Sequence, residues 1–188
     1  MYNNHYITIK NEKYPCKACG ILPYTILNNE LFFLLQKKKN SKLYSDFGGK
    51  RETIDTSIMS TAAREFSEET NGYFFSNKIL SKKKSNNDLI KKSKIIIESK
   101  LKYTNPLYIY NFNGKYLLYL LYIYPVHLNK LDNIEIYSNI KRSCKWIKGL
   151  FLLDNNFINT NLEYRLRKGL KKKINILYKE LYNNQSIY

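Results

Sequence analysis

The chain has 188 residues and a mass of 22.4 kDa, a length that predicts a single domain over 1–188. Its hydrophobic content of 44% is enough for a folded core. The longest apolar stretch, 116–124, is too short to span a bilayer as a helix, and no apolar run follows a basic start. We therefore expect neither contact with a membrane nor a secretory signal.

The cysteines are few and odd in number, which argues against a disulfide framework. Cys16 and Cys19 have the spacing of a metal-binding pair, but a structural zinc ion needs four ligands, and His5 and His127 lie at no matching distance in the sequence. We expect two reduced thiols near the start of a strand. Together with Cys144 they predict a reducing compartment, the cytoplasm, or a virion if the source is viral.

The first half of the chain predicts two strands, a loop and a helix. Residues 18–27 and 30–36 are apolar and rich in strand-forming types, and the asparagine pair at 28–29 predicts a hairpin between them. Residues 44–49 lead into a loop that contains glycine, and the next helix is expected over 57–70.

The second half begins with a basic, polar segment over 77–105. We interpret it as an insertion, part loop and part helix or strand, of the kind that sets substrate choice. Strands over 107–112 and 115–124 flank an Asn-Gly pair, a strong hairpin signal. A further strand is expected at 144–147.

A C-terminal helix is predicted over 160–182. Thr160 is its expected N-cap, and Glu163 stands three residues later, as in a capping box. The apolar residues that recur at helical spacing are Leu162, Leu166, Leu170, Ile174, Leu177 and Leu181. This order of elements predicts an α/β fold, a mixed β-sheet with helices on both sides.

Three carboxylates stand close together on the helix expected over 57–70. They follow an arginine in the run Arg64-Glu65-Phe66-Ser67-Glu68-Glu69. On a helix the three glutamates fall within an arc of roughly 100°, whereas Phe66, Ala63 and Met59 share another face and are expected to be buried. An all-carboxylate cluster favours Mg²⁺ or Mn²⁺. The alternative is a solvated helix face with an ion pair from Arg64 to Glu68.

Two features just before this helix favour the metal site. The Gly48-Gly49 pair gives the backbone freedom for a tight loop. Asp55 adds an acid within reach of the start of the helix. A glycine turn, a loop acid and an acidic helix in this order form the layout of a phosphate–metal site.

This layout resembles the Nudix box, the loop–helix–loop signature of the Nudix hydrolase family. The box reads Gly, five residues, Glu, seven residues, Arg-Glu, an aliphatic or aromatic residue, any residue, Glu-Glu, any residue, Gly. Here Gly49 is followed by five residues and then Asp55, and the run 64–69 fits without a gap. The resemblance covers about 48–72 of the chain.

The chain departs from the box in three places. Asp55 stands where the family has Glu, eight residues rather than seven precede Arg64, and Asn71 takes the glycine position, with Gly72 next. Asn tolerates a left-handed backbone nearly as well as Gly does. The wording of the motif also looks like that of Nudix proteins from large DNA viruses, some of which remove mRNA caps.

The resemblance implies an α/β/α sandwich and a hydrolase that splits a diphosphate linkage in a nucleoside diphosphate joined to another group. It implies that Glu65 and Glu69 hold Mg²⁺ or Mn²⁺ together with the Gly49 carbonyl, that Glu68 is a further ligand or positions water, and that Arg64 orients these carboxylates. The general base is expected to be a box glutamate or an acid on a later loop. The candidate bases are Glu68, Glu69, Asp132 and Glu135. The candidate substrate-binding residues are Lys50 and Arg51.

The charge of the chain predicts a polyanionic partner. Lys and Arg number 32 against 15 acidic residues, a net charge of +17 and a pI near 9.6. The clusters lie at 37–39, 82–84, 91–92 and 171–173, and the many Tyr and Phe residues offer stacking surfaces for RNA bases. The alternative is compositional, because AT-rich codons encode Lys, Asn, Ile, Tyr and Phe.

Several substrates and functions fit the sequence. Within the enzyme interpretation they are capped mRNA, a dinucleoside polyphosphate or damaged nucleotide, and a diphosphoinositol polyphosphate. A Nudix-fold module that binds RNA or a nucleotide without cleaving it is a second class, and a basic structural or packaging protein is a third. The sequence does not give the oligomeric state.

Overall fold

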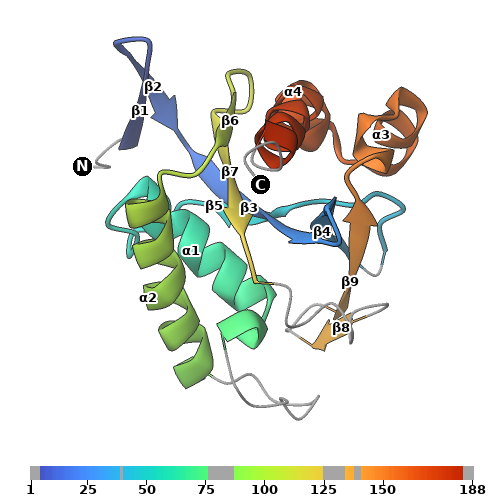
Figure 1. The fold of residues 1–188 in the computed structure, drawn as a ribbon. Coiled ribbons are helices and arrows are strands. Elements are labelled where there is room, and N and C mark those ends of the chain that lie inside the picture. The colour runs from blue at the N-terminus through green and yellow to red at the C-terminus, as the bar shows by residue number, and fades with distance from the viewer. Residues whose placement is uncertain (1–4, 39, 76–86, 125–133, 138–140, 184–188) are drawn as a thin grey trace.

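A mixed β-sheet lies between two layers of helices (Figure 1). The computed structural model describes residues 5–38, 40–75, 87–124, 134–137 and 141–183. The strands are β1 (His5–Ile9), β2 (Glu12–Cys16), β3 (Ala18–Leu27), β4 (Glu30–Lys38), β5 (Phe47–Lys50), β6 (Tyr108–Asn111), β7 (Tyr116–Tyr122), β8 (Ile134–Tyr137) and β9 (Lys141–Lys148). The helices are α1 (Ile58–Glu69), α2 (Asn87–Thr104), α3 (Asn155–Asn161) and α4 (Tyr164–Asn183), with 3-10 turns η1 (Tyr73–Phe75) and η3 (Phe151–Leu153).

The order of the strands brings distant parts of the chain together. The larger sheet runs β6-β7-β3-β4-β9-β8, with β5 paired to β3. β3 and β7 are parallel, and every other pair in this sheet is antiparallel. The α/β/α sandwich with a mixed sheet that the sequence predicts is therefore confirmed.

The local turn signals work as expected. Asn28 and Asn29, which join β3 to β4, have φ values of 49° and 61°, the left-handed conformation that a two-residue hairpin turn requires. The β6–β7 hairpin also forms, but its left-handed residue is Lys115, at φ 49°, rather than the glycine before it. β7 is buried along almost its whole length because a central strand is covered on both faces.

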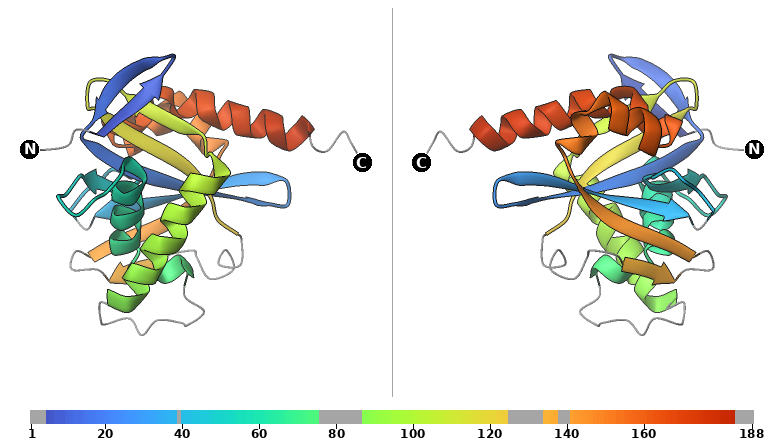
Figure 2. Two further views of the ribbon diagram at one scale, coloured as in Figure 1. Left: turned by 90° about the vertical axis from the view of Figure 1, so that its left-hand side faces the viewer. Right: turned by 90° about the vertical axis from the view of Figure 1, so that its right-hand side faces the viewer.

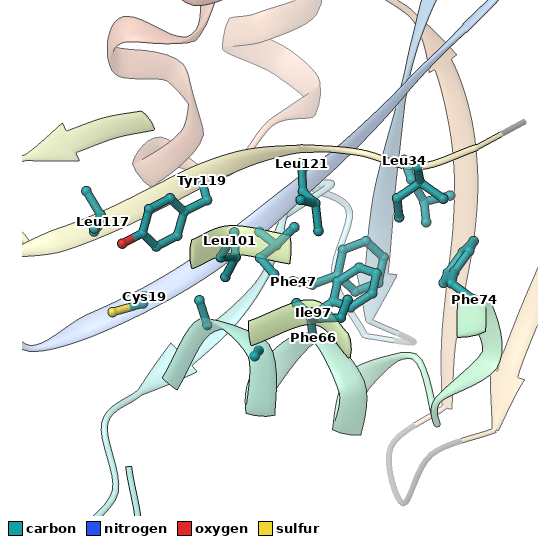
Figure 3. Packing of buried hydrophobic residues seen from close by; sticks show 14 of the residues in the cluster. Cys19, Leu34, Phe47, Phe66, Phe74, Ile97, Leu101, Leu117, Tyr119 and Leu121 are labelled. Carbon is teal, nitrogen blue, oxygen red and sulfur yellow. The ribbon is translucent and has the colours of Figure 1, made fainter. Parts of the chain in front are cut away.

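Alternation along the strands builds a separate core on each face of the sheet. One face of β7 presents Leu117, Tyr119 and Leu121 to α1 and α2 (Figure 3). The other face presents Leu118 and Leu120 to α3 and α4. Successive residues of β7 thus contact different helical layers.

The helix α1 forms where the sequence predicts it. Ser57 caps its N-terminus by accepting a hydrogen bond from the Ser60 amide, and Thr70 ends it. Ala63 and Phe66 are fully buried and Met59 is partly buried, as expected. The chain then turns through Asn71 and Gly72, both at positive φ, so Asn71 adopts the left-handed backbone that asparagine tolerates.

Much of the segment expected over 77–105 is a core element. Its helix α2 packs along α1, and Ile97 and Leu101 are fully buried against the sheet (Figures 1 and 3). Residues 76–86 lie outside the described residues. The expected mixture of loop and helix is confirmed for the helical part, whereas its role as an insertion stays a prediction.

The predicted start of the C-terminal helix is wrong. Thr160 lies inside α3, and α4 begins at Tyr164. The cause is a β-bridge between Tyr44 and Leu162. The Tyr44 amide donates to the Asn161 carbonyl and the Tyr44 carbonyl accepts from the Glu163 amide, so Leu162 between them stays extended. A second break, at Gly169 with φ 85°, kinks α4. The predicted apolar face is confirmed, because its residues line the second core.

The N-terminal hairpin of β1 and β2 was not expected from the sequence. It forms a two-stranded sheet of its own and leads directly into β3 (Figures 1 and 2). None of the helices in the described part of the chain is long and apolar enough to cross a membrane.

Candidate active site

The motif glycines lie in a strand, which corrects the expectation of a tight loop. Gly48 and Gly49 belong to β5 and neither has a positive φ. Their function is steric. A Cβ on Gly49 would stand 2.5 Å from Oε1 of Glu65, and a Cβ on Gly48 would collide with the hydroxyl of Tyr116. Because neighbouring residues in a strand face opposite sides, one glycine admits Glu65 and the other admits Tyr116.

Arg64 is the centre of the site. Its guanidinium is buried and donates to both oxygens of Asp55 at 3.0 Å, and Nη2 also donates to the Lys50 carbonyl at 2.9 Å. Nη1 donates to Glu65 at 2.9 Å and to Glu68 at 3.1 Å. The ion pair from Arg64 to Glu68 is therefore present, but as one part of a larger cluster.

The shorter acid at the loop position reaches its partner. The side chain of Asp55 is 0% exposed, and it also accepts a hydrogen bond from the Glu52 amide at 2.9 Å. Burial raises the pKa of Asp55, but the hydrogen bonds from Arg64 and Glu52 outweigh burial and lower this pKa below its usual value. Asp55 thus acts as the fixed counter-ion of Arg64.

The pKa values of Arg64 and Glu65 respond to the same cluster. Burial alone would lower the pKa of Arg64, but its hydrogen bonds to Asp55 and the charges of Glu65, Asp55 and Glu68 raise it. Burial raises the pKa of Glu65, and the nearby Arg64 charge offsets only part of this increase. Because burial makes the charged form of Glu65 costly, a bound cation beside it would stabilise that form.

The third glutamate lies apart from the other two. Glu69 is 7% exposed, and its Oε2 accepts hydrogen bonds from Gln36 Nε2 at 2.6 Å and from the Gly48 amide at 2.9 Å. Glu68, at 48% side-chain exposure, faces outward. The single acidic patch expected from helical spacing is therefore divided into an inner, an intermediate and an outer carboxylate, because β5 covers the last turn of α1.

The donor chemistry fits Mg²⁺ or Mn²⁺. The Glu65 carboxylate lies against Gly49, and the next residue, Lys50, has its carbonyl in the Arg64 cluster. Carboxylate and carbonyl oxygens are the hard ligands that these ions prefer. The glycine leaves the space in which the Glu65 carboxylate rests against the strand. Within the described residues no three His, Cys, Asp or Glu side chains converge on one point.

The other predicted site residues vary in how the structure places them. Lys50 is exposed at the end of β5, and the Arg51 amide donates to the Lys17 carbonyl at 3.2 Å. Glu135 lies in β8, in register with Ser143 of β9. Asp132 lies outside the described residues. The roles of all four stay predictions.

The cysteine pair lies around the start of β3, the place expected from the sequence, and its redox state stays a prediction. Cys16 and Cys19 are both buried and free, with Sγ atoms 3.4 Å apart. The hydrogen bond from Cys19 lowers the pKa of Cys16, and the same bond together with burial raises the pKa of Cys19. Cys144 is also buried and is in no disulfide bond.

Sequence reasoning missed the residues that hold Glu69 and the segment that leads into β5. Gln36 is fully buried in β4, and Asp46 is fully buried just before β5. A glutamine that continues an apolar strand, and an acid two positions before a Gly-Gly pair, were the available signals. Nothing in the sequence connects Tyr116 or Arg165 with them.

The described lysine clusters lie on different faces. Lys91 and Lys92 are exposed on α2, whereas Lys171 and Lys172 are exposed on α4. The sheet lies between these two helices, so the two clusters belong to opposite helical layers (Figure 1). The cluster at 82–84 lies outside the described residues.

No protein-family model matches the chain. An uncharacterised protein of Acanthamoeba polyphaga mimivirus is 44% identical over 78 residues, which are 39% of this chain and 24% of that protein. The chain therefore spans about a quarter of the length of this relative. Among solved structures, a C. elegans Ap4A hydrolase in a binary complex is similar, with a TM-score of 0.49 and 17% identity over 86% of this chain and 97% of that chain.

Proposed function

We propose that this chain is a hydrolase that uses Mg²⁺ or Mn²⁺ to split a diphosphate linkage in a nucleoside diphosphate joined to another group. The observation that carries the proposal is the arrangement around Arg64. A buried guanidinium, neutralised by Asp55, holds Glu65 and Glu68 beside the glycine strand. A helix face that served only for solubility would not bury its arginine and place a glycine against its glutamate.

Each acidic residue would have a separate part in the reaction. Glu65, Glu68 and Glu69, with the Gly49 carbonyl, would hold the divalent ions, which withdraw charge from phosphoryl oxygens when bound. Arg64 orients Glu65 and Glu68 and does not need to touch the substrate. Glu68, the most exposed of the three, is best placed to accept a proton from water. Glu135 remains the candidate base outside the motif.

Capped RNA is the substrate that we favour, because the net charge of +17 suits a long polyanion and the chain has many aromatic residues. The alternatives are a dinucleoside polyphosphate and a diphosphoinositol polyphosphate. We expect the protein to act in the cytoplasm of a host cell or in a virion.

A panel of substrates tests the activity. Capped RNA, free cap analogue, diadenosine polyphosphates, nucleoside triphosphates and diphosphoinositol phosphates are compared at fixed salt with Mg²⁺, with Mn²⁺ and with EDTA. We expect turnover that requires a divalent ion, and faster cleavage of capped RNA than of the free analogue. Turnover that EDTA leaves unchanged would contradict the metal requirement.

The lysine clusters provide a matched comparison within the same assay. The variants Lys91→Gln/Lys92→Gln and Lys171→Gln/Lys172→Gln remove equal charge from opposite faces of the sheet. If RNA follows one face, one variant will raise KM for capped RNA and weaken its salt dependence, and the other will not. Equal cleavage of capped RNA and cap analogue by the wild type would assign the charge to codon composition.

One observation favours a second candidate, a module that binds RNA or a nucleotide without cleaving it. Nη1 of Arg64 pairs with both Glu65 and Glu68, so these two carboxylates have a counter-charge without a metal ion. Tight RNA binding with no turnover on any diphosphate in the panel would favour this candidate over the hydrolase.

The space beside Gly49 gives a specific prediction. In Gly49→Ala the new methyl group displaces the Glu65 carboxylate, so we expect Mn²⁺ affinity, measured by calorimetry, to fall about tenfold while the Tm changes little. The matched control is Gly114→Ala, whose added Cβ would have no neighbour nearer than 3.8 Å. Equal Mn²⁺ affinity in the two variants would remove Glu65 from the proposed metal site.

A further inference from the structure

A buried polar network lies on the α4 face of the sheet, opposite α1. The hydroxyl of Tyr116 donates to Oδ2 of Asp46, and Oδ1 of Asp46 lies 2.9 Å from Nε of Arg165 in an ion pair. The Arg165 guanidinium also stands 5.1 Å from the centre of the Tyr116 ring and 3.1 Å from Glu163. Tyr116 comes from β7, Asp46 from the segment before β5 and Arg165 from α4, and Glu163 lies just before that helix.

The burial of this network makes it costly to disrupt. Asp46 is fully buried, and a buried carboxylate is tolerated only when it is paired and hydrogen-bonded. Burial and the charge of Asp46 raise the pKa of Tyr116 well above its usual value, so the hydroxyl remains a donor. Gly20 and Gly48 both lack the Cβ that would collide with this hydroxyl, so the backbone fits closely around it.

Asp46 connects the network to the acidic helix on the other face. Its side chain bonds Tyr116, whereas its carbonyl accepts a hydrogen bond from Gln36 Nε2 at 2.6 Å. The same Nε2 donates to Glu69, and the Gly48 amide, two residues after Asp46, donates to the same oxygen of Glu69. A shift of the segment 46–48 would therefore disturb both of these bonds to Glu69 at once.

We propose that Tyr116, Asp46 and Arg165 are positioning residues that fix the Gly48 amide and Gln36 against Glu69, and so set the inner carboxylate of the site from the opposite face of the sheet. None of the three needs to touch a substrate. The effect on catalysis rests on the function proposed above. The effect on the Gly48 amide does not depend on any activity.

The test uses Tyr116→Phe, which removes one hydroxyl, with Tyr119→Phe as control. Tyr119 is equally buried on the same strand but faces the other core. Hydrogen exchange of the Gly48 amide is followed by NMR, with the Leu170 amide in α4 as an internal reference. In Tyr116→Phe we expect Gly48 exchange to rise about tenfold with Leu170 unchanged, because a buried charge loses a donor. Tyr119→Phe should alter neither amide.

Kinetics and a second pair of variants complete the test. We expect kcat of Tyr116→Phe to fall with KM unchanged, and the same loss in Arg165→Met with partial recovery in Arg165→Lys, which keeps the charge. Arg165 is 27% exposed, so these variants test the proposal even if Tyr116→Phe does not fold.

The outcomes separate this proposal from the proposed function. Exchange at Gly48 that stays at the wild-type rate, or that rises together with Leu170, would overturn the positioning role whether or not the enzyme is active. A wild type that cleaves no diphosphate would overturn the proposed function. The exchange rate of the Gly48 amide in Tyr116→Phe would then be the test of the positioning role.

Discussion

Replacement of Arg64 by methionine should lower the free energy of unfolding by about 3 to 5 kcal/mol, as measured by urea denaturation at pH 7. The variant leaves the carboxylate of Asp55 buried at 0% exposure without its counter-ion, and it leaves the Lys50 carbonyl without this donor. The size of the effect comes from the uncompensated charge rather than from the attraction that is lost. Arg167→Met is the control, because Arg167 donates to the Leu162 carbonyl and forms no ion pair with a carboxylate among the described residues.

A double-mutant cycle separates this cause from a loss of packing. Arg64→Met/Asp55→Asn should be less destabilised than Arg64→Met alone, because the buried charge is also gone. The pKa of Asp55 is lowered in the folded state, so its ion pair stabilises the protein fully above the unfolded pKa of about 3.9 and is lost as pH falls through the folded value. A coupling energy between the two residues that does not decrease as the pH falls below about 3.9 would contradict this account.

Glu69→Gln should reduce kcat for diphosphate hydrolysis at least about 100-fold, the scale on which loss of one electrostatic group slows an enzyme. Glutamine keeps the length of the side chain and an oxygen that can accept from the Gly48 amide. The variant should therefore remain folded while it loses the negative charge at the innermost position. Rates at saturating Mg²⁺, together with thermal unfolding, check both parts.

Glu180→Gln is the matched control, since Glu180 is an exposed glutamate near the end of α4. It should leave kcat unchanged. If folded Glu69→Gln hydrolysed diphosphates at the wild-type rate, the acidic helix would have no catalytic part, and salt-sensitive RNA binding that also survives the substitution would favour a basic packaging protein.

Elements whose signals are local could be predicted from the sequence. The turn at Asn28 and Asn29 forms because both residues tolerate positive φ. The helix α1 begins at the residue after Ser57 because that hydroxyl caps it. By contrast, the start of α4 was predicted wrongly, because the capping pattern at Thr160 is overridden when Leu162 pairs with Tyr44, far away in the chain.

The same division holds within the site. The run 64–69 by itself determined that an arginine and three glutamates share one helix, and this is enough to predict hard-cation chemistry. Only the tertiary structure decided which carboxylate is inner and which is outer, because Glu69 is held by Gln36, 33 residues away, and by a strand that crosses the end of α1.

The two motif glycines show the physical reason most clearly. Their identity is visible in the sequence, but their function depends on what approaches them: Glu65 on one side of β5 and, on the other, Tyr116, whose partner Asp46 is 70 residues away in the chain. Spacing along a chain specifies helical faces and turns. Long-range packing of a sheet between two cores decides which side chains meet, and the sequence alone does not contain that information in any local pattern.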